Sequence, residues 1–258
     1  MTGARTFATV AIAAALATMA SPASADDNPP PFDRPGIGFA SAVLPAGSFD
    51  WEQGLPDLQR DGSGGDHATT WTADTLFRVG LTPTLELQLS GSPWNRSDVR
   101  SAGVHSHAQG AGDAAIGLKW APALASKRWS LALLGVVSVP IGSAAFSAGH
   151  TVTSLGAAAT ADLGDNRSLE FYGNLDHGAG QNTWTLAVNL GFPIHGNLGG
   201  YVETAHIAGG GPTSALVGAG LAWLLHGRVQ LDLYADAGLT RSSPDYLAGL
   251  GVSVFFGQ

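Results

Sequence analysis

The chain has 258 residues, of which 45% are hydrophobic and 12% are charged, with 36 glycines and no cysteine. The lack of cysteine excludes a disulfide framework and thiol chemistry, and the formal net charge of −8 argues against nucleic acid as a partner. The hydrophobic fraction excludes a disordered chain, and the lack of a Gly-X-Y period excludes collagen. One large folded domain is left.

The first 25 residues predict an export signal. Arg5 supplies a positive charge, residues 7–20 are apolar, and Ala23-Ser24-Ala25 is a small-residue cleavage site. A membrane anchor is the alternative, but the apolar stretch is too short to span a bilayer. The predicted regions are a signal peptide over residues 1–25, a proline-rich periplasmic lead over residues 26–35, and one domain over residues 36–258.

The domain shows a period-2 alternation of apolar and polar residues, which predicts strands with different surroundings on their two faces. The clearest case is Arg228–Leu239, where apolar residues alternate with Gln230, Asp232, Tyr234 and Asp236. In chain order, the predicted strands are Gly36–Leu44, Asp66–Leu81, Leu85–Gly91, Ala111–Trp120, Trp129–Val139, Thr151–Leu163, Ser168–His177, Asn182–Phe192, Leu198–His206, Ser214–Leu225, Arg228–Leu239 and Asp245–Phe256.

These strands predict an all-β fold, namely a closed antiparallel transmembrane β-barrel of about 12 strands that follows a cleaved signal peptide, with ten or fourteen strands as alternatives. Pro45–Gly65, Ser92–Gly110 and Pro140–His150 are predicted as long extracellular loops, opposite short periplasmic turns. We expect the longest, Pro45–Gly65, to form a plug or constriction. A soluble sandwich would also segregate its faces, but the export signal and the loop asymmetry favour the outer membrane.

The alternation also assigns the two faces of the wall, because a charge facing lipid at mid-bilayer costs about 2–4 kcal/mol. The predicted lumen positions are Asp74, Arg78, Glu86, Gln88, Asp113, Lys119, Glu170, Tyr172, Asn174, Asp176, Asn189, Tyr201, Glu203, Asp232 and Asp236. The predicted lipid-facing positions are Trp71, Phe77, Val79, Leu85, Leu87, Leu89, Ile116, Leu118, Trp120, Leu131, Leu133, Val137, Leu169, Phe171, Trp184, Leu186, Val188 and Leu190.

Two segments resemble a known family of outer-membrane proteins. Gly110-Ala111-Gly112-Asp113, followed by Gly117-Leu118-Lys119-Trp120, is similar to a strand of the family called "putative MetA-pathway of phenol degradation". Arg34-Pro35-Gly36-Ile37-Gly38-Phe39, followed by Leu44-Pro45-Ala46-Gly47 and Glu52-Gln53-Gly54, resembles its first hairpin. The resemblance implies an outer-membrane barrel that transports small aromatic or apolar compounds. The chain departs from most such barrels by ending two residues beyond its last phenylalanine, Phe256.

The predicted function is passive passage of small molecules through a monomeric outer-membrane barrel, with outer-membrane lipid and a small solute as its partners. An acidic lumen favours cations or neutral solutes over anions, but the same charges are equally explained by structural pairs such as Arg78 with Glu86. The alternatives are a hydrolase acting on lipid or peptide, and a non-conducting structural barrel.

The sequence gives no cofactor and no catalytic site. Asp176 and His177 are neighbours on a strand and must point to opposite faces, and no Gly-x-Ser-x-Gly motif is present. His105 and His107 offer two imidazoles to a metal, but histidines of an exposed polar loop are the commoner explanation.

Overall fold

The computed structural model describes residues 31–63, 65–225 and 227–257. The predicted signal peptide and the first residues of the predicted lead lie outside this range, so the cleavage site stays a prediction. No helix within the described residues is long and apolar enough to cross a membrane.

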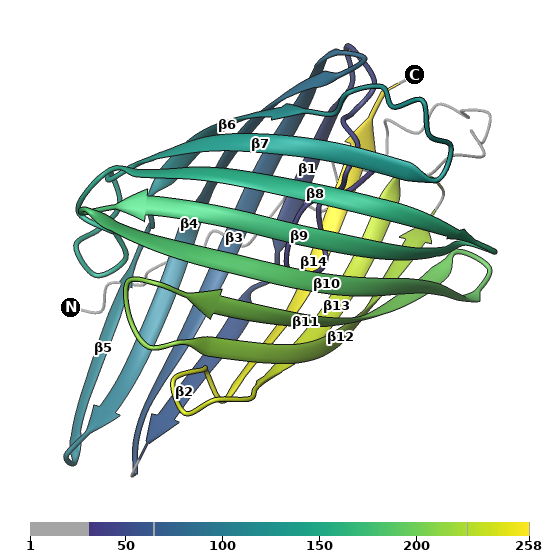
Figure 1. Cartoon of the computed structure of the whole chain (residues 1–258). Coiled ribbons are helices and arrows are strands. Elements are labelled where there is room, and N and C mark those ends of the chain that lie inside the picture. Colours follow the sequence, from purple (N-terminus) through teal and green to yellow (C-terminus); the bar gives the residue numbers. More distant parts are fainter. Residues whose placement is uncertain (1–30, 64, 226, 258) are drawn as a thin grey trace, which may run out of the picture.

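The described chain forms one closed antiparallel β-barrel (Figure 1). The last strand returns to pair with the first two, so the sheet has no free edge. The strands are β1 (Phe49–Gly54), β2 (Asp57–Ser63), β3 (Asp66–Thr82), β4 (Leu85–Ser101), β5 (Val104–Gly110), β6 (Ala114–Trp120), β7 (Trp129–Val139), β8 (Val152–Gly164), β9 (Arg167–Gly178), β10 (Gln181–His195), β11 (Leu198–Ala208), β12 (Ser214–Leu225), β13 (Val229–Gly238) and β14 (Tyr246–Phe256).

These fourteen segments make twelve barrel strands, because two barrel strands are interrupted. β1 and β2 both lie between β3 and β14, and Leu55-Pro56 separates them. β5 and β6 both pair with β4, and residues 111–113 separate them. A proline cannot donate to a ladder, which accounts for the break at Pro56. The predicted closed barrel of twelve strands is confirmed.

The position of the first strand was predicted wrongly. Gly36–Leu44 is not a strand but runs through the inside of the barrel, whereas the predicted loop Pro45–Gly65 supplies β1 and β2. The alternation over Phe49–Gly54 is short and is followed by Pro56, so it reads as a loop. The apolar residues of Gly36–Leu44 pack against the inner wall rather than against lipid.

The predicted loop Ser92–Gly110 is also mostly strand. β4 continues to Ser101 and β5 starts at Val104, so this hairpin and β2–β3 reach beyond the other strands at one end of the barrel (Figure 1). The third predicted loop, Pro140–His150, is confirmed as the connection between β7 and β8. We call this end the long-loop end. By the rule for outer-membrane barrels it faces the cell exterior.

The opposite, short-turn end has tight connections such as Pro83-Thr84 and Asp165-Asn166. Asp165 and Asn166 both have positive φ, 53° and 56°, which is the geometry of the two-residue hairpin turns that match strand twist. The predicted turns at both places are confirmed.

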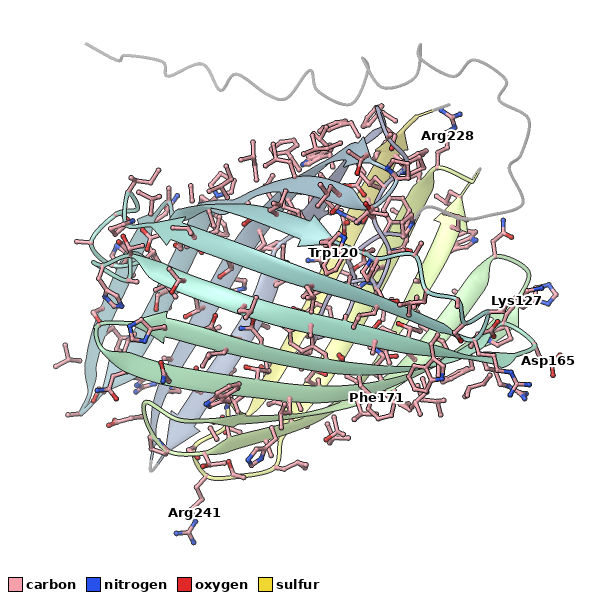
Figure 2. All side chains as sticks on the ribbon, turned by 45° about the horizontal axis from the view of Figure 1, so that its top comes forward. Trp120, Lys127, Asp165, Phe171, Arg228 and Arg241 are labelled. Atoms are coloured by element: carbon pink, nitrogen blue, oxygen red, sulfur yellow. The ribbon has the colours of Figure 1, made fainter. Side chains whose placement is uncertain are left out.

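The two faces of the wall are also as predicted. On the outside, the apolar side chains of Leu186 and Ile116 are 56% and 49% exposed, while Arg78, Glu86 and Lys119 on the inside are fully buried. Figure 2 shows Trp120 and Phe171 on the outer surface. Such an apolar exterior is stable only in lipid.

Candidate functional site

The barrel interior is crossed by residues 31–44, which we call the lumen segment. Its backbone is hydrogen-bonded to the wall at widely spaced strands. The Ile37 N–H donates to Glu203 on β11 at 2.8 Å, and the Leu44 N–H donates to Glu86 on β4 at 2.8 Å. The expected plug is therefore present, but it is made by the lumen segment and not by Pro45–Gly65.

Apolar contacts hold the middle of the lumen segment. Phe39 is buried against Ala132 and Leu134 of β7 and Ala158 of β8. Its ring meets that of Tyr172 edge to face, with 5.6 Å between centroids. A sequence signal for this packing existed, because alanine and leucine at inward positions of β7 and β8 are out of place in a lumen filled only by water.

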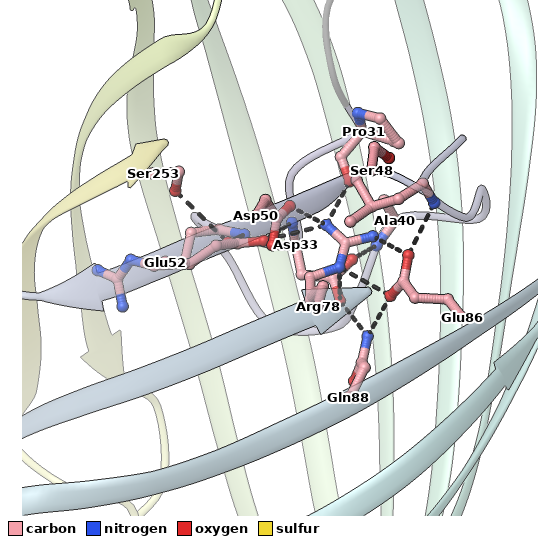
Figure 3. Close-up of polar contacts among 12 residues, drawn as sticks. Pro31, Asp33, Ala40, Ser48, Asp50, Glu52, Arg78, Glu86, Gln88 and Ser253 are labelled. Atoms are coloured by element: carbon pink, nitrogen blue, oxygen red, sulfur yellow. Dashed lines mark hydrogen bonds and ion pairs between the residues drawn. The ribbon is translucent and has the colours of Figure 1, made fainter. Parts of the chain in front are cut away.

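A buried ion network holds the beginning of the lumen segment (Figure 3). The guanidinium of Arg78 donates two bonds of 2.8 Å to Glu86 and further bonds to Asp50 at 3.1 Å and Glu52 at 3.0 Å. It also donates to the backbone carbonyl of Pro31 at 2.6 Å. Arg78 thus joins three strands of the wall to the segment.

Asp33 is the carboxylate that the lumen segment adds to this network. It accepts a bond of 2.7 Å from the Lys119 ammonium and one of 2.9 Å from Gln88, and it lies 3.6 Å from Arg78. In return, Glu52 on the wall accepts the backbone N–H of Asp33 at 2.8 Å. The segment and the wall therefore hold each other through both side chain and backbone.

Arg34 forms a second ionic contact beside the first. Its guanidinium lies 3.2 Å from Asp57 on β2 and 3.2 Å from Asp232 on β13, and its carbonyl accepts a bond from Gln230. Sequence reasoning missed both Asp33 and Arg34, because it placed them in a periplasmic lead. Residues 31–35 of that lead lie instead inside the barrel.

The ten charged residues among the predicted lumen positions are distributed over several environments. Arg78, Glu86 and Lys119 belong to the network, and the predicted pair of Arg78 with Glu86 is confirmed. Asp232 and Glu203 contact the lumen segment directly. Sequence reasoning missed the inward acids Asp50, Glu52 and Asp57, because they fall in the predicted loop. The period-2 spacing of Asp50 and Glu52 around Trp51 was the available signal.

The other five charged residues lie away from the network. Glu170 accepts a bond of 3.3 Å from Thr160, Asp176 accepts a bond from Ser154, and Asp74 lines a cavity. Asp236 is buried on β13.

Asp113 lies in the break between β5 and β6 and secures the long loop. Its carboxylate accepts the backbone N–H groups of Ala148 at 2.8 Å and Gly142 at 2.9 Å, and these bonds lower the pKa of Asp113 below its usual value. It therefore anchors the loop between β7 and β8, and it also borders the lumen.

Two inward-facing glycines of β12 make room for large polar side chains. A Cβ on Gly220 would collide with the ring of Tyr201, and one on Gly218 would collide with the carboxylate of Asp236. Both side chains can lie flat against the wall only because these positions are glycine. This close approach keeps free space in the lumen.

Two cavities border the lumen segment, of about 470 Å³ and about 380 Å³. The larger one has a mixed lining, with Asp33, Arg34, Asp74 and Gln88 beside Phe39, Leu134 and Val136, among others. The smaller one is mixed, and its lining includes Ile37, Tyr172, Ile207, Leu216, Tyr234 and Asp236.

The histidines offer no metal centre in the described part of the chain, where no group of three or more ligating side chains occurs. His105 and His107 share the outer face of β5, at positions paired with Arg100 and Asp98. His177 bonds to Asn182 at 2.7 Å while Asp176 bonds to Ser154, in line with the expectation that they point to opposite faces.

A closed barrel with an apolar exterior, a charged interior and a segment across its lumen is an outer-membrane β-barrel protein, located in the outer membrane of the cell. More particularly, the chain belongs to the family described as "Putative MetA-pathway of phenol degradation", whose model matches residues 32–256. A search of curated proteins found no match.

Solved structures share the fold at low sequence identity. The COG4313 outer membrane channel from Pseudomonas putida F1 is similar with a TM-score of 0.72 and 13% identity, over 86% of this chain and 99% of that one. The KdgM porin in complex with disordered oligogalacturonate gives 0.54 and 10%, over 82% and 99%. The NanC porin gives 0.54 and 11%, over 80% and 98%.

Proposed function

We propose that the protein is a passive outer-membrane channel for small molecules, in which the lumen segment narrows the path. The observation that carries this proposal is the pair of cavities, both bordered by Gly36 of the lumen segment and by Tyr172 of β9. A barrel of twelve strands is wider than the eight-stranded kind that side chains alone fill, and these cavities are the part of its interior that the segment leaves open. The similarity to channels and porins supports the same proposal.

We propose small aromatic or apolar compounds with a polar group as the solutes. The smaller cavity combines aliphatic and tyrosine side chains with Asp236, and such a lining suits a ring that bears a hydroxyl group. The name of the family points to phenol degradation. The lining therefore supports from chemistry what the family name suggests.

The experiment compares two neutral solutes in proteoliposomes by stopped-flow light scattering. After the rate of empty liposomes is subtracted, resorcinol should enter faster than arabinose, and Tyr234→Ala should reduce this preference. Tyr246→Ala is the matched control, because Tyr246 is exposed at the end of β14. Rates equal to those of empty liposomes for both solutes would favour a non-conducting barrel.

We also propose that the lumen prefers cations. Asp33, Asp57 and Asp232 face arginine or lysine, but Glu170, Asp176 and Asp236 have no ion pair among the described residues. Charges in a narrow bore are poorly screened, so these three carboxylates should bias permeation.

Reversal potentials across a salt gradient test this selectivity. Replacing the three carboxylates together by their amides should lower the cation preference. Asp232 is left intact, because its removal would also free Arg34. An anion-selective wild-type channel would refute the electrostatic argument.

A further inference from the structure

The outer surface near the long-loop end carries a cluster of basic side chains that the channel function does not use. We call it the outer basic patch, and it lies on the hairpins β2–β3 and β4–β5. Its members are Arg60, His67, Arg96, Arg100, His105 and His107.

Strand register places these side chains on one face. His67 pairs with Arg100, which pairs in turn with His105, so the three stand side by side across β3, β4 and β5. Arg60 of β2 pairs with Thr69, which lies two residues from His67 on the same face of β3. Its guanidinium donates a bond of 3.0 Å to the Thr69 hydroxyl.

This face is the lipid-facing one. Arg60 pairs with Tyr246 of β14, whose side chain is exposed on the outside. Arg96 pairs with Trp71, which shares its side of β3 with the exposed Phe77. The guanidinium of Arg96 stacks on the Trp71 ring, 5.7 Å from its centroid. The patch therefore lies on the same outer face as the apolar belt and adjoins it on the side of the long-loop end.

The order of side chains along β4 gives the depth of the patch. Outward residues run from Leu85, Leu87 and Leu89 through Trp94 to Arg96 and Arg100. Tryptophan marks the membrane interface. Arg96 lies two residues beyond Trp94, about 5 Å further along the membrane normal for a strand tilted by about 40°. Arg96 is thus at the level of the lipid headgroups, and Arg100, four residues further along β4, lies about 10 Å beyond it along the membrane normal.

The patch is cationic within an acidic protein. Two carboxylates lie beside it: Asp98 on β4 is paired with Arg96 at 2.9 Å, and Asp245 approaches Gly62 of β2 from the connection before β14. Arg100 is exposed. Arginine binds phosphate through its planar fork of donors, and a row of such groups suits a ligand with more than one phosphate.

We propose that the outer basic patch binds the phosphate groups of a phosphorylated glycolipid of the outer leaflet, the lipid A of lipopolysaccharide. Its acyl chains would lie along the apolar belt below Trp71 and Trp94, and its phosphates beside Arg60, Arg96 and Arg100. This binding fixes the barrel to its lipid shell and does not depend on what the lumen conducts.

The test titrates the folded full-length protein in detergent with purified bisphosphorylated lipid A, with dephosphorylated lipid A, and with inorganic phosphate. Each arginine near an anionic surface is worth about fivefold in affinity, so the triple variant Arg60→Gln, Arg96→Gln, Arg100→Gln should bind bisphosphorylated lipid A on the order of 100-fold more weakly. The control is Lys127→Gln, Arg167→Gln, Arg228→Gln, which removes the same charge at the short-turn end and should bind like wild type.

Three outcomes would overturn the proposal. Equal losses in the two triple variants would mean that net charge alone matters, and equal affinity for dephosphorylated lipid A would mean that only the acyl chains bind. Inorganic phosphate that binds the patch as tightly as lipid A would assign it to a soluble anion. If the triple variant does not fold, Arg100→Gln alone should weaken binding about fivefold, and no change would contradict the proposal.

Discussion

Asp33→Asn should loosen the lumen segment while it leaves the barrel folded. The Asp33 carboxylate accepts from Lys119 at 2.7 Å and lies 3.6 Å from Arg78, and both cations are fully buried. Removing one partner of a buried ion pair costs about 3–5 kcal/mol, because the remaining charge is left uncompensated. The pairs of Arg78 with Glu86 and Asp50 stay within the wall.

A loss of about 3 kcal/mol raises the ratio of displaced to seated segment by a factor on the order of 10². Single-channel recording in planar bilayers should show this as more frequent or longer openings. Asp176→Asn is the control, because this substitution removes the same charge from the lumen. Asp176 accepts its bond from Ser154 on β8 and not from the lumen segment. An unchanged open probability in Asp33→Asn, with heat-modifiable migration intact, would mean that this ion pair does not hold the segment.

Three further predictions follow from the wall and the loop. Leu233→Arg should destabilise the barrel by about 2–4 kcal/mol in urea unfolding from bilayers, because Leu233 faces lipid; the same loss in Asp236→Asn would mean that the faces are misassigned. Gly220→Val should destabilise by about 1–3 kcal/mol by displacing Tyr201, and an unchanged unfolding midpoint would contradict this. The lowered pKa of Asp113 means that its hold on the loop is complete above its unfolded pKa of 3.8 and is lost as the pH falls through the lower folded pKa. A spin label at Ala144→Cys should therefore become mobile in acid, and Asp113→Asn should make it mobile at all pH values.

The sequence predicts the wall of this barrel well because each wall position has one simple constraint. Each side chain faces either the lipid, as Leu186 does, or the interior, as Glu86 does. The period-2 alternation of apolar and polar residues predicts this choice directly. The short turn at Asp165-Asn166 is also local, since its backbone requires residues that tolerate positive φ.

The position of the lumen segment could not be predicted in this way, because the residues that it contacts are distant in the sequence. Phe39 and Ile37 are apolar and alternate with small residues, so they resemble a lipid-facing strand, yet they pack on alanines of β7, β8, β10 and β11. Asp33 and Arg34 look like linker residues until β1, β3 and β6 bring Glu52, Arg78 and Lys119 around them. A hydrophobic pattern specifies that a residue is buried, but not against which surface.

The two kinds of contact suggest where the lumen segment yields. Its C-terminal end continues into β1 and is fixed at Gly80, where the Gly47 N–H donates to the Gly80 carbonyl at 2.8 Å and a Cβ on Gly80 would collide with the carbonyl of Pro45. Beside the buried ring of Phe32, its beginning is held by ionic and hydrogen-bonded contacts of Pro31, Asp33 and Arg34, which water can replace. Because polar contacts exchange with water more readily than apolar packing does, displacement should start at Asp33 and Arg34 and pivot near Leu44. The constriction thus continues directly into the barrel wall at β1. The side chains that hold the lumen segment across the path, Asp33 and Arg34, also determine how easily the path opens.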